Sequence, residues 1–111
     1  MNAQVDFNSL KIGFGTSPLM GEEATTAVAS ALDAGYTLID TASKYENEEA
    51  VGQGIKASGV AREDVILQTK LRGNDHGDVR GALERSLSRL GVDYLDAWLI
   101  HWPLPMLGLY P

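Results

Sequence analysis

Short apolar runs of strand type alternate with longer segments of helical periodicity along the chain. Apolar side chains recur every three or four residues in three segments, at residues 22–34, 48–58 and 79–90. Strand-type runs lie before, between and after these segments, at residues 12–15, 36–40, 65–70 and 94–100. A strand that returns to its sheet through a helix pairs in parallel, by a right-handed crossover. The alternation therefore predicts an α/β fold with parallel strands.

Local signals mark the ends of the predicted helices. Asn47 and Asp78 stand directly before the second and third helices, in the position of N-caps. Gly35, Gly59 and Gly91 follow the three helices, where a left-handed backbone conformation commonly ends a helix. The third helix is expected to bury one apolar stripe, formed by Val79, Leu83, Leu87 and Leu90.

The predicted strands are nearly all apolar, which is typical of a parallel sheet covered on both faces. Two architectures satisfy this pattern: a small open doubly wound sheet of flavodoxin type, and half of a (β/α)8 barrel. A short hairpin is also expected before the first strand, with residues 5–7 and 10–11 flanking an Asn8-Ser9 turn. No linker or second domain is visible in residues 1–111.

Composition excludes several classes of function. The chain has 9 basic and 15 acidic residues, a net charge of −6 and no basic cluster, so nucleic acid and anionic membranes are poor partners. The absence of cysteine excludes disulfides, Cys–zinc sites and thiol catalysis. No run approaches the ~18 apolar residues of a membrane span, and the N-terminus does not resemble a signal peptide. We therefore expect a cytoplasmic protein.

Two motifs invite a ligand-binding interpretation that their details do not support. Gly13-Phe14-Gly15 resembles the start of a dinucleotide-binding motif, but Pro18 occupies the third glycine position. The same loop, residues 15–18, is too short and too proline-bearing for the phosphate loop of a flavodoxin-like domain. Residues 74–78 (NDHGD) contain metal-ligand types but are expected to form a turn and a helix cap, so no metal site is predicted.

Polar side chains close the apolar strands. Asp40 ends the second predicted strand, Lys70 ends the third and His101 follows the fourth. Tyr45 lies in the loop after the second strand. Each has a simpler explanation when taken singly, as a cap, a solvated strand end, a core histidine or a loop aromatic. Because the carboxyl ends of parallel strands meet at one edge, where α/β barrels carry their active sites, together they predict one polar site.

Five sequence motifs surround these residues. They are Ile12–Thr16, Gly35–Glu49 with Val51-Gly52, Thr69–Leu71, Ser86-Leu87 with Leu90–Asp96, and Leu99–Pro103. Together they resemble the aldo-keto reductase family, near its prokaryotic members, over about residues 7–110. The resemblance implies a (β/α)8 barrel, of which this chain holds about the first four strands and three helices. It also implies reduction of a small aldehyde or ketone with NADPH.

The resemblance assigns catalytic roles to four matching residues. Tyr45 is expected to protonate the carbonyl oxygen as a general acid, with help from the positive charge of Lys70, because a phenol alone is a weak acid. Asp40 is expected to hold Lys70 in position and balance its charge. His101 is expected to donate a hydrogen bond that orients the carbonyl. Hydride would come from the nicotinamide, so the cofactor carries the redox step.

The resemblance also implies binding roles around these residues. Thr16 and Asp40 match positions near the nicotinamide ribose. Trp102 matches an aromatic wall of the substrate pocket, with core packing as the simpler alternative. Ser17 stands where many relatives carry an aromatic residue, which would remove one wall of that pocket. The expected contacts of the substrate are Ser17, Tyr45, His101 and Trp102.

By the same resemblance, residues 1–111 correspond to the N-terminal half of a barrel, truncated after strand four. The other half would hold most of the NADPH site, so these residues alone are expected to bind NADPH weakly or not at all and to be inactive. Half a ring would expose interior side chains, including Ile39, Leu67 and Leu99, and leave two strand edges open. The full-length enzyme is expected to be monomeric. The alternative to an enzyme is a non-catalytic half-barrel that self-associates.

Overall fold

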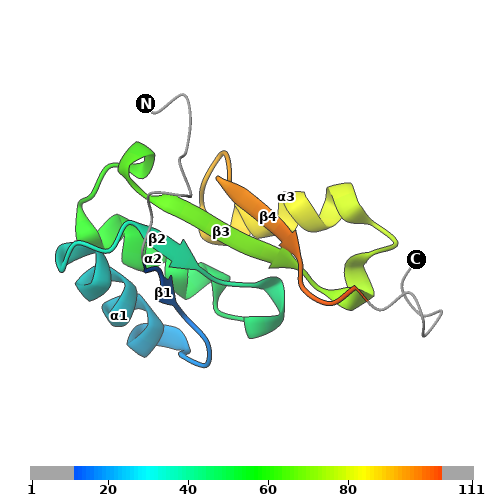
Figure 1. Ribbon diagram of the computed structural model, residues 1–111. Coiled ribbons are helices and arrows are strands. Elements are labelled where there is room, and N and C mark those ends of the chain that lie inside the picture. Colours follow the sequence, from blue (N-terminus) through cyan, green and yellow to red (C-terminus); the bar gives the residue numbers. More distant parts are fainter. Residues whose placement is uncertain (1–11, 104–111) are drawn as a thin grey trace.

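Four strands and three α-helices alternate along the chain in a computed structural model that describes residues 12–103 (Figure 1). The strands are β1 (Phe14–Gly15), β2 (Leu38–Asp40), β3 (Ile66–Leu71) and β4 (Ala97–Ile100). The helices are α1 (Gly21–Asp33), α2 (Glu48–Ser58) and α3 (Val79–Leu90). Three short 3-10 helices lie in the loops: η2 (Ser43–Tyr45), η3 (Arg62–Asp64) and η4 (Gly73–Asp75). The predicted N-terminal hairpin lies outside the described residues.

The predicted helix boundaries are confirmed within one residue. Asp78 caps α3, since its carboxylate accepts a hydrogen bond from the Gly81 N–H at 3.2 Å. Gly35, Gly59 and Gly91 follow their helices with positive φ angles of 106°, 74° and 69°. All four strands are shorter than predicted or shifted by one residue.

The predicted start of β4 at residue 94 is wrong. In residues 94–96, side-chain contacts of Asp96 and of Arg62 take the place of strand pairing. The Asp96 carboxylate accepts a hydrogen bond from the Leu67 N–H at 2.8 Å, where a strand would offer a carbonyl oxygen. The Arg62 guanidinium lies 3.9 Å from the centre of the Tyr94 ring and donates to the Tyr94 carbonyl at 2.6 Å. Regular pairing with β3 therefore begins only at Ala97.

The strands form one parallel sheet in the order β1-β2-β3-β4. The register pairs Asp40 with Gln68 and Lys70 with Leu99, so these four side chains share one face. Gly15 pairs with Asp40 and belongs to the same face. The sheet is thus a run of βα units wound in sequence order, with its polar residues toward the carboxyl ends.

The helices pack on the opposite face of the sheet and bury it. The core cluster consists of Val28, Leu32, Ile39, Val51, Ile55, Val65, Leu67 and Leu90. The expectation that Ile39 and Leu67 face the barrel interior is therefore wrong, because strand alternation turns them away from Asp40 and toward the helices. Leu99 does lie on the interior face and is 43% exposed. Burial along β3 alternates, so within residues 12–103 only one face of the sheet is fully covered.

The buried stripe of α3 also differs from the prediction. Val79 is 48% exposed, and the residues that α3 buries are Ala82, Ser86 and Leu90. Small side chains bring α3 close to α2: a Cβ atom added at Gly52 would overlap the Leu90 carbonyl oxygen. Close helix approach, rather than the largest apolar side chains, sets which face of α3 is inward.

Candidate active site

Lys70 joins Asp40 and Tyr45 at the carboxyl edge of the sheet. Its Nζ lies 2.9 Å from both carboxylate oxygens of Asp40 and 3.2 Å from the Tyr45 hydroxyl oxygen. It also lies 3.0 Å from the Thr41 carbonyl oxygen. The parallel register of β2 and β3 places Asp40 and Lys70 side by side, and η2 then folds Tyr45 back over them.

The donor count of Lys70 decides the direction of the Tyr45 hydrogen bond. An ammonium group has three N–H donors and no acceptor. Its three acceptor groups here are the Asp40 carboxylate, the Thr41 carbonyl and the Tyr45 hydroxyl oxygen. Because Tyr45 accepts from Lys70, its own O–H proton remains available to a different acceptor.

His101 and Trp102 complete the cluster after β4. The Tyr45 and His101 rings meet edge to face, with centroids 5.6 Å apart and an interplanar angle of 89°. His101 and Trp102 stack with centroids 5.5 Å apart and an angle of 5°. The backbone N–H of His101 donates to the Leu71 carbonyl at 3.0 Å, which continues the β3–β4 ladder and fixes the backbone there. Trp102 is 50% exposed, so core packing does not describe it.

The environment of His101 favours its neutral form. Partial burial lowers the pKa of His101 below its ordinary value, and the positive charges of Lys70, Lys44 and Arg72 lower it further, against a smaller opposing effect of Asp40. The buried Nδ1 atom has no hydrogen-bond partner among residues 12–103. Near neutral pH the side chain is therefore an uncharged imidazole, which carries one N–H donor.

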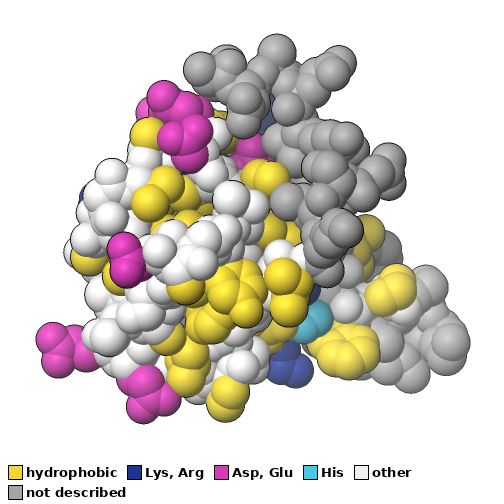
Figure 2. Space-filling view, turned by 60° about the vertical axis from the view of Figure 1, so that its left-hand side comes forward, with side chains coloured by type: hydrophobic (Ala, Val, Ile, Leu, Met, Phe, Trp, Pro, Cys, Tyr) yellow, Lys and Arg dark blue, Asp and Glu magenta, His cyan; other side chains and the backbone are white. Residues whose placement is uncertain are grey.

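A hollow of about 350 Å³ opens beside Tyr45 and His101. Its lining is formed by Ser17, Pro18, Lys44, Tyr45, His101 and Trp102. We call it the Tyr45–His101 cleft. Four of the predicted site residues thus line one cleft, and Lys70 and Asp40 lie directly behind Tyr45. Figure 2 shows hydrophobic side chains gathered on one face, with a histidine and a basic side chain at its lower right.

Thr16 lies at this edge but is fully buried, and its contacts are internal. Its N–H donates to the Asp40 carbonyl at 3.1 Å, and its hydroxyl accepts from Asn47 Nδ2 at 3.1 Å. Asn47 occupies the N-cap position of α2, yet the expected capping bond is absent. Its amide instead joins the β1–α1 loop to the β2–α2 loop, donating to the Leu19 carbonyl at 3.0 Å and accepting from the Thr41 hydroxyl at 2.6 Å.

The sequence analysis missed Gln68 as a member of the cluster. Its Nε2 donates to Asp40 Oδ1 at 2.8 Å. The sequence indicates that Gln68, two residues before Lys70 in a strand, shares its face, but not that it pairs with Asp40.

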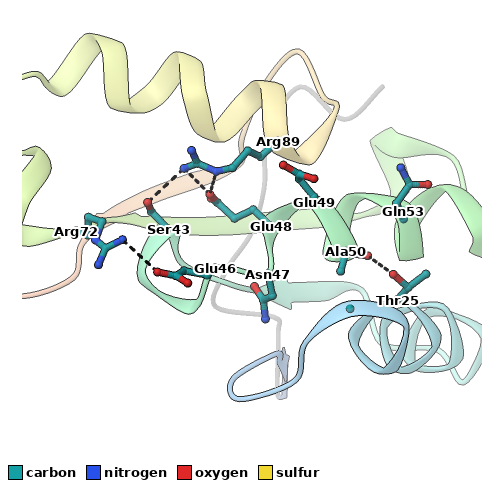
Figure 3. A pocket seen from close by; sticks show the side chains of 11 residues that line it. Thr25, Ser43, Glu46, Asn47, Glu48, Glu49, Ala50, Gln53, Arg72 and Arg89 are labelled. Carbon is teal, nitrogen blue, oxygen red and sulfur yellow. Dashed lines mark hydrogen bonds and ion pairs between the residues drawn. The ribbon is translucent and has the colours of Figure 1, made fainter.

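A second hollow, of about 590 Å³, is lined by residues of α1, η2, α2 and α3 and by Arg72 (Figure 3). In its lining the Glu48 carboxylate, whose side chain is 0% exposed, pairs with the Arg89 guanidinium at 2.7 Å and accepts from the Thr69 hydroxyl at 2.7 Å. Arg89 also donates to the Ser43 hydroxyl at 3.2 Å. These bonds anchor η2, and with it Tyr45, to α3.

The 74–78 loop forms the predicted turn and helix cap. Arg85 contacts Asp75 at 3.5 Å and Asp78 at 3.3 Å. Within residues 12–103, no three His, Cys, Asp or Glu side chains are grouped as a metal site would require. Nor does that part of the chain contain a helix long and apolar enough to cross a membrane.

Known proteins similar to this chain are aldo-keto reductases. The family described as "Aldo/keto reductase family" matches residues 11–108. An aldo-keto reductase of Mycolicibacterium paratuberculosis is 48% identical over 109 residues, which is 95% of this chain and 38% of that protein. The curated relatives that head the comparison are likewise covered over little more than a third of their length.

Solved structures give the same result. The aldo/keto reductase of Brucella melitensis superposes with a TM-score of 0.80 and 48% identity, over 84% of this chain and 36% of that one. An aldo-keto reductase of Bombyx mori, solved in complex with NADP, superposes with a TM-score of 0.76 and 42% identity, over 83% of this chain and 34% of that one. The parallel βα units described above are the fold of these (β/α)8 enzymes over their matching third. By sequence and by fold, the chain belongs to the aldo/keto reductase family.

Proposed function

We propose that this chain supplies the proton-donating part of an active site that reduces an aldehyde or ketone to an alcohol with NADPH. Family membership supports carbonyl reduction by an oxidoreductase. The observation that carries the finer proposal is the placement of Lys70 between the Asp40 carboxylate and the Tyr45 hydroxyl. This arrangement turns a tyrosine beside an open cleft into a proton donor.

The chain's own residues handle the proton and the carbonyl. A carbonyl oxygen in the Tyr45–His101 cleft accepts the Tyr45 O–H proton, and the ammonium of Lys70 stabilises the phenolate that remains. Asp40 keeps Lys70 in place and balances its charge when the site is at rest. Neutral His101 donates its N–H to the same oxygen and sets the orientation of the carbonyl.

The described residues fit the reacting end of NADPH. A Cβ atom added at Gly15 would meet nothing within 4 Å, so the sheet face next to Asp40 is open at this point. Asp40, with a side chain 26% exposed, is proposed to hold the ribose of the nicotinamide. The buried Thr16 is proposed to support it, by donating its backbone N–H to the Asp40 carbonyl. When bound there, the nicotinamide supplies the hydride. The NADP in the Bombyx mori relative supports this choice of cofactor.

The substrate is proposed to be a small molecule, and the site of action the cytoplasm. The alternative is a half-barrel without catalytic activity, which predicts no alcohol even when the rest of the barrel is supplied. These 111 residues span about a third of their relatives, so activity is proposed for a polypeptide that also supplies the remaining part of the site. The 111-residue chain alone is proposed to be inactive.

The test is a fusion protein, in which residues 1–103 are followed by the corresponding remainder of the Brucella melitensis reductase. We expect it to consume NADPH and to form benzyl alcohol from benzaldehyde in equal amounts. A folded fusion protein that binds NADPH but forms no alcohol would contradict the proposal and support the non-catalytic alternative.

A further inference from the structure

Lys44 is the charged side chain of the Tyr45–His101 cleft. The other described residues of the lining are a serine, a proline, a tyrosine, a tryptophan and a histidine that is neutral near pH 7. Lys44 is exposed, and within residues 12–103 it forms no hydrogen bond or ion pair. Its ammonium is therefore a cation at the cleft that no carboxylate among residues 12–103 neutralises.

The carboxylates near the cleft are occupied by other cations. Asp40 is bound through both oxygens by Lys70, and the exposed Glu46 faces Arg72 at 4.0 Å. The pKa of His101 is lowered first by partial burial and then by Lys70, Lys44 and Arg72, while Asp40 alone opposes them, which agrees with an excess of positive charge here. This local excess stands out in a chain with a net charge of −6.

We propose that Lys44 makes the enzyme prefer carbonyl substrates that carry a carboxylate group. The inference rests on the proposed function, because it needs the carbonyl to be held at Tyr45 and His101. Lys44 precedes Tyr45 in η2, so its ammonium lies at the same cleft as the proton donor and can pair with a carboxylate at the other end of a small substrate. An unpaired cation in a cleft attracts anionic ligands, and this attraction weakens as salt rises.

The test compares two substrates of nearly the same shape in the fusion protein: terephthalaldehydic acid, which carries a carboxylate, and its uncharged methyl ester. Lys44→Met should lower the ratio of kcat/KM for the acid to kcat/KM for the ester about two- to fivefold, the range of an exposed ion pair. The loss should shrink at high salt, and Lys44→Arg should restore the preference. Lys56→Met removes the same charge from the C-terminal turn of α2 and should change neither value.

Two results would overturn this inference in different ways. If Lys44→Met changes the acid and the ester equally, or neither, the selectivity claim is wrong while turnover of both aldehydes sustains the proposed function. If a folded fusion protein that binds NADPH reduces neither aldehyde, the proposed function fails and the inference fails with it.

A binding measurement separates affinity from turnover. In the fusion protein, the acid should shift the side-chain NMR signal of His101 at a lower concentration than the ester does. Lys44→Met should abolish that difference. Equal responses to the acid and the ester in the unmodified fusion protein would overturn the inference.

Discussion

The ammonium of Lys70 has opposite consequences for Tyr45 and His101. In the proposed reaction, it would stabilise the phenolate that proton donation leaves on Tyr45, 3.2 Å away. It disfavours a positive charge on His101 and so, after burial, helps to keep the imidazole neutral. In the proposed mechanism, one cation thus supports both a proton donor and a neutral hydrogen-bond donor at the same cleft.

The titration of His101 tests this arrangement. Burial, then Lys70, lowers the pKa of His101, so we expect its NMR titration in the fusion protein to have a midpoint below the ordinary ~6.5. Lys70→Met removes one of the causes and should raise that midpoint. A His101→Gln variant assigns the signal. An unchanged midpoint in Lys70→Met would show that Lys70 does not act on His101.

The same shift has a consequence for stability. Between the lowered pKa and about 6.5, the unfolded chain binds the histidine proton more readily than the folded chain does. The His101 contribution to the free energy of unfolding therefore falls as pH drops through this window, and it is constant above about pH 6.5.

At the scale of elements, the pair between the buried Glu48 and the partly exposed Arg89 links α2 to α3 and holds η2 through Ser43. Arg89→Met would leave the Glu48 carboxylate buried, with the Thr69 hydroxyl as its remaining bond among those described. We expect the free energy of unfolding to fall by about 2–3 kcal/mol, since removing one partner strands a buried charge. Denaturant unfolding of the fusion protein measures this change.

Arg85→Met is the matched control on the same helix. Arg85 pairs with Asp75 and Asp78 in solvent-exposed contacts, so its loss should cost less than about 1 kcal/mol. Equal losses in the free energy of unfolding for the two variants would show that the Glu48–Arg89 pair stabilises the fold no more than an exposed pair does.

Elements with local end signals were predictable from the sequence, and features set by distant contacts were not. The spans of α2 and α3 follow from Asp78, Gly59 and Gly91, whose conformations depend on adjacent residues. Asn47 stands at the predicted N-cap position, but its amide bonds to a loop 31 and 28 residues away in sequence, at Thr16 and Leu19, in place of the capping bond. Similarly, β4 starts late because of the Asp96 side chain.

The site could be predicted as a group of residues but not as a hydrogen-bonded cluster. Strand ends alone indicated that Asp40, Lys70 and His101 would share an edge, and the structure brings them together with Tyr45. The contribution of Gln68 requires the β2–β3 register, which the sequence does not specify. The roles of these residues in catalysis stay predictions.

At the scale of the whole molecule, the main feature of the βα units in residues 12–103 is that the interior face of their sheet is open. Leu99 on this face is 43% exposed and Trp102 after β4 is 50% exposed, and Ile100, on the opposite face at the end of β4, is 59% exposed. Apolar surface of this kind favours association. We expect the purified 111-residue chain to scatter light as an aggregate or oligomer and to show no saturable change in NADPH fluorescence. Saturable NADPH binding by a monomer with one sharp unfolding transition would contradict this expectation.

The most direct test of the proposed function is the Tyr45→Phe variant of the fusion protein, which removes only the hydroxyl. Because a positioned general acid contributes about 10²–10⁴-fold, kcat for aldehyde reduction should fall by that factor while NADPH affinity is unchanged. Tyr36→Phe, at a ring packed edge to face on Phe14, is the control and should keep full activity. A Tyr45→Phe variant that reduces the aldehyde at the unmodified rate would show that Tyr45 is not the proton donor.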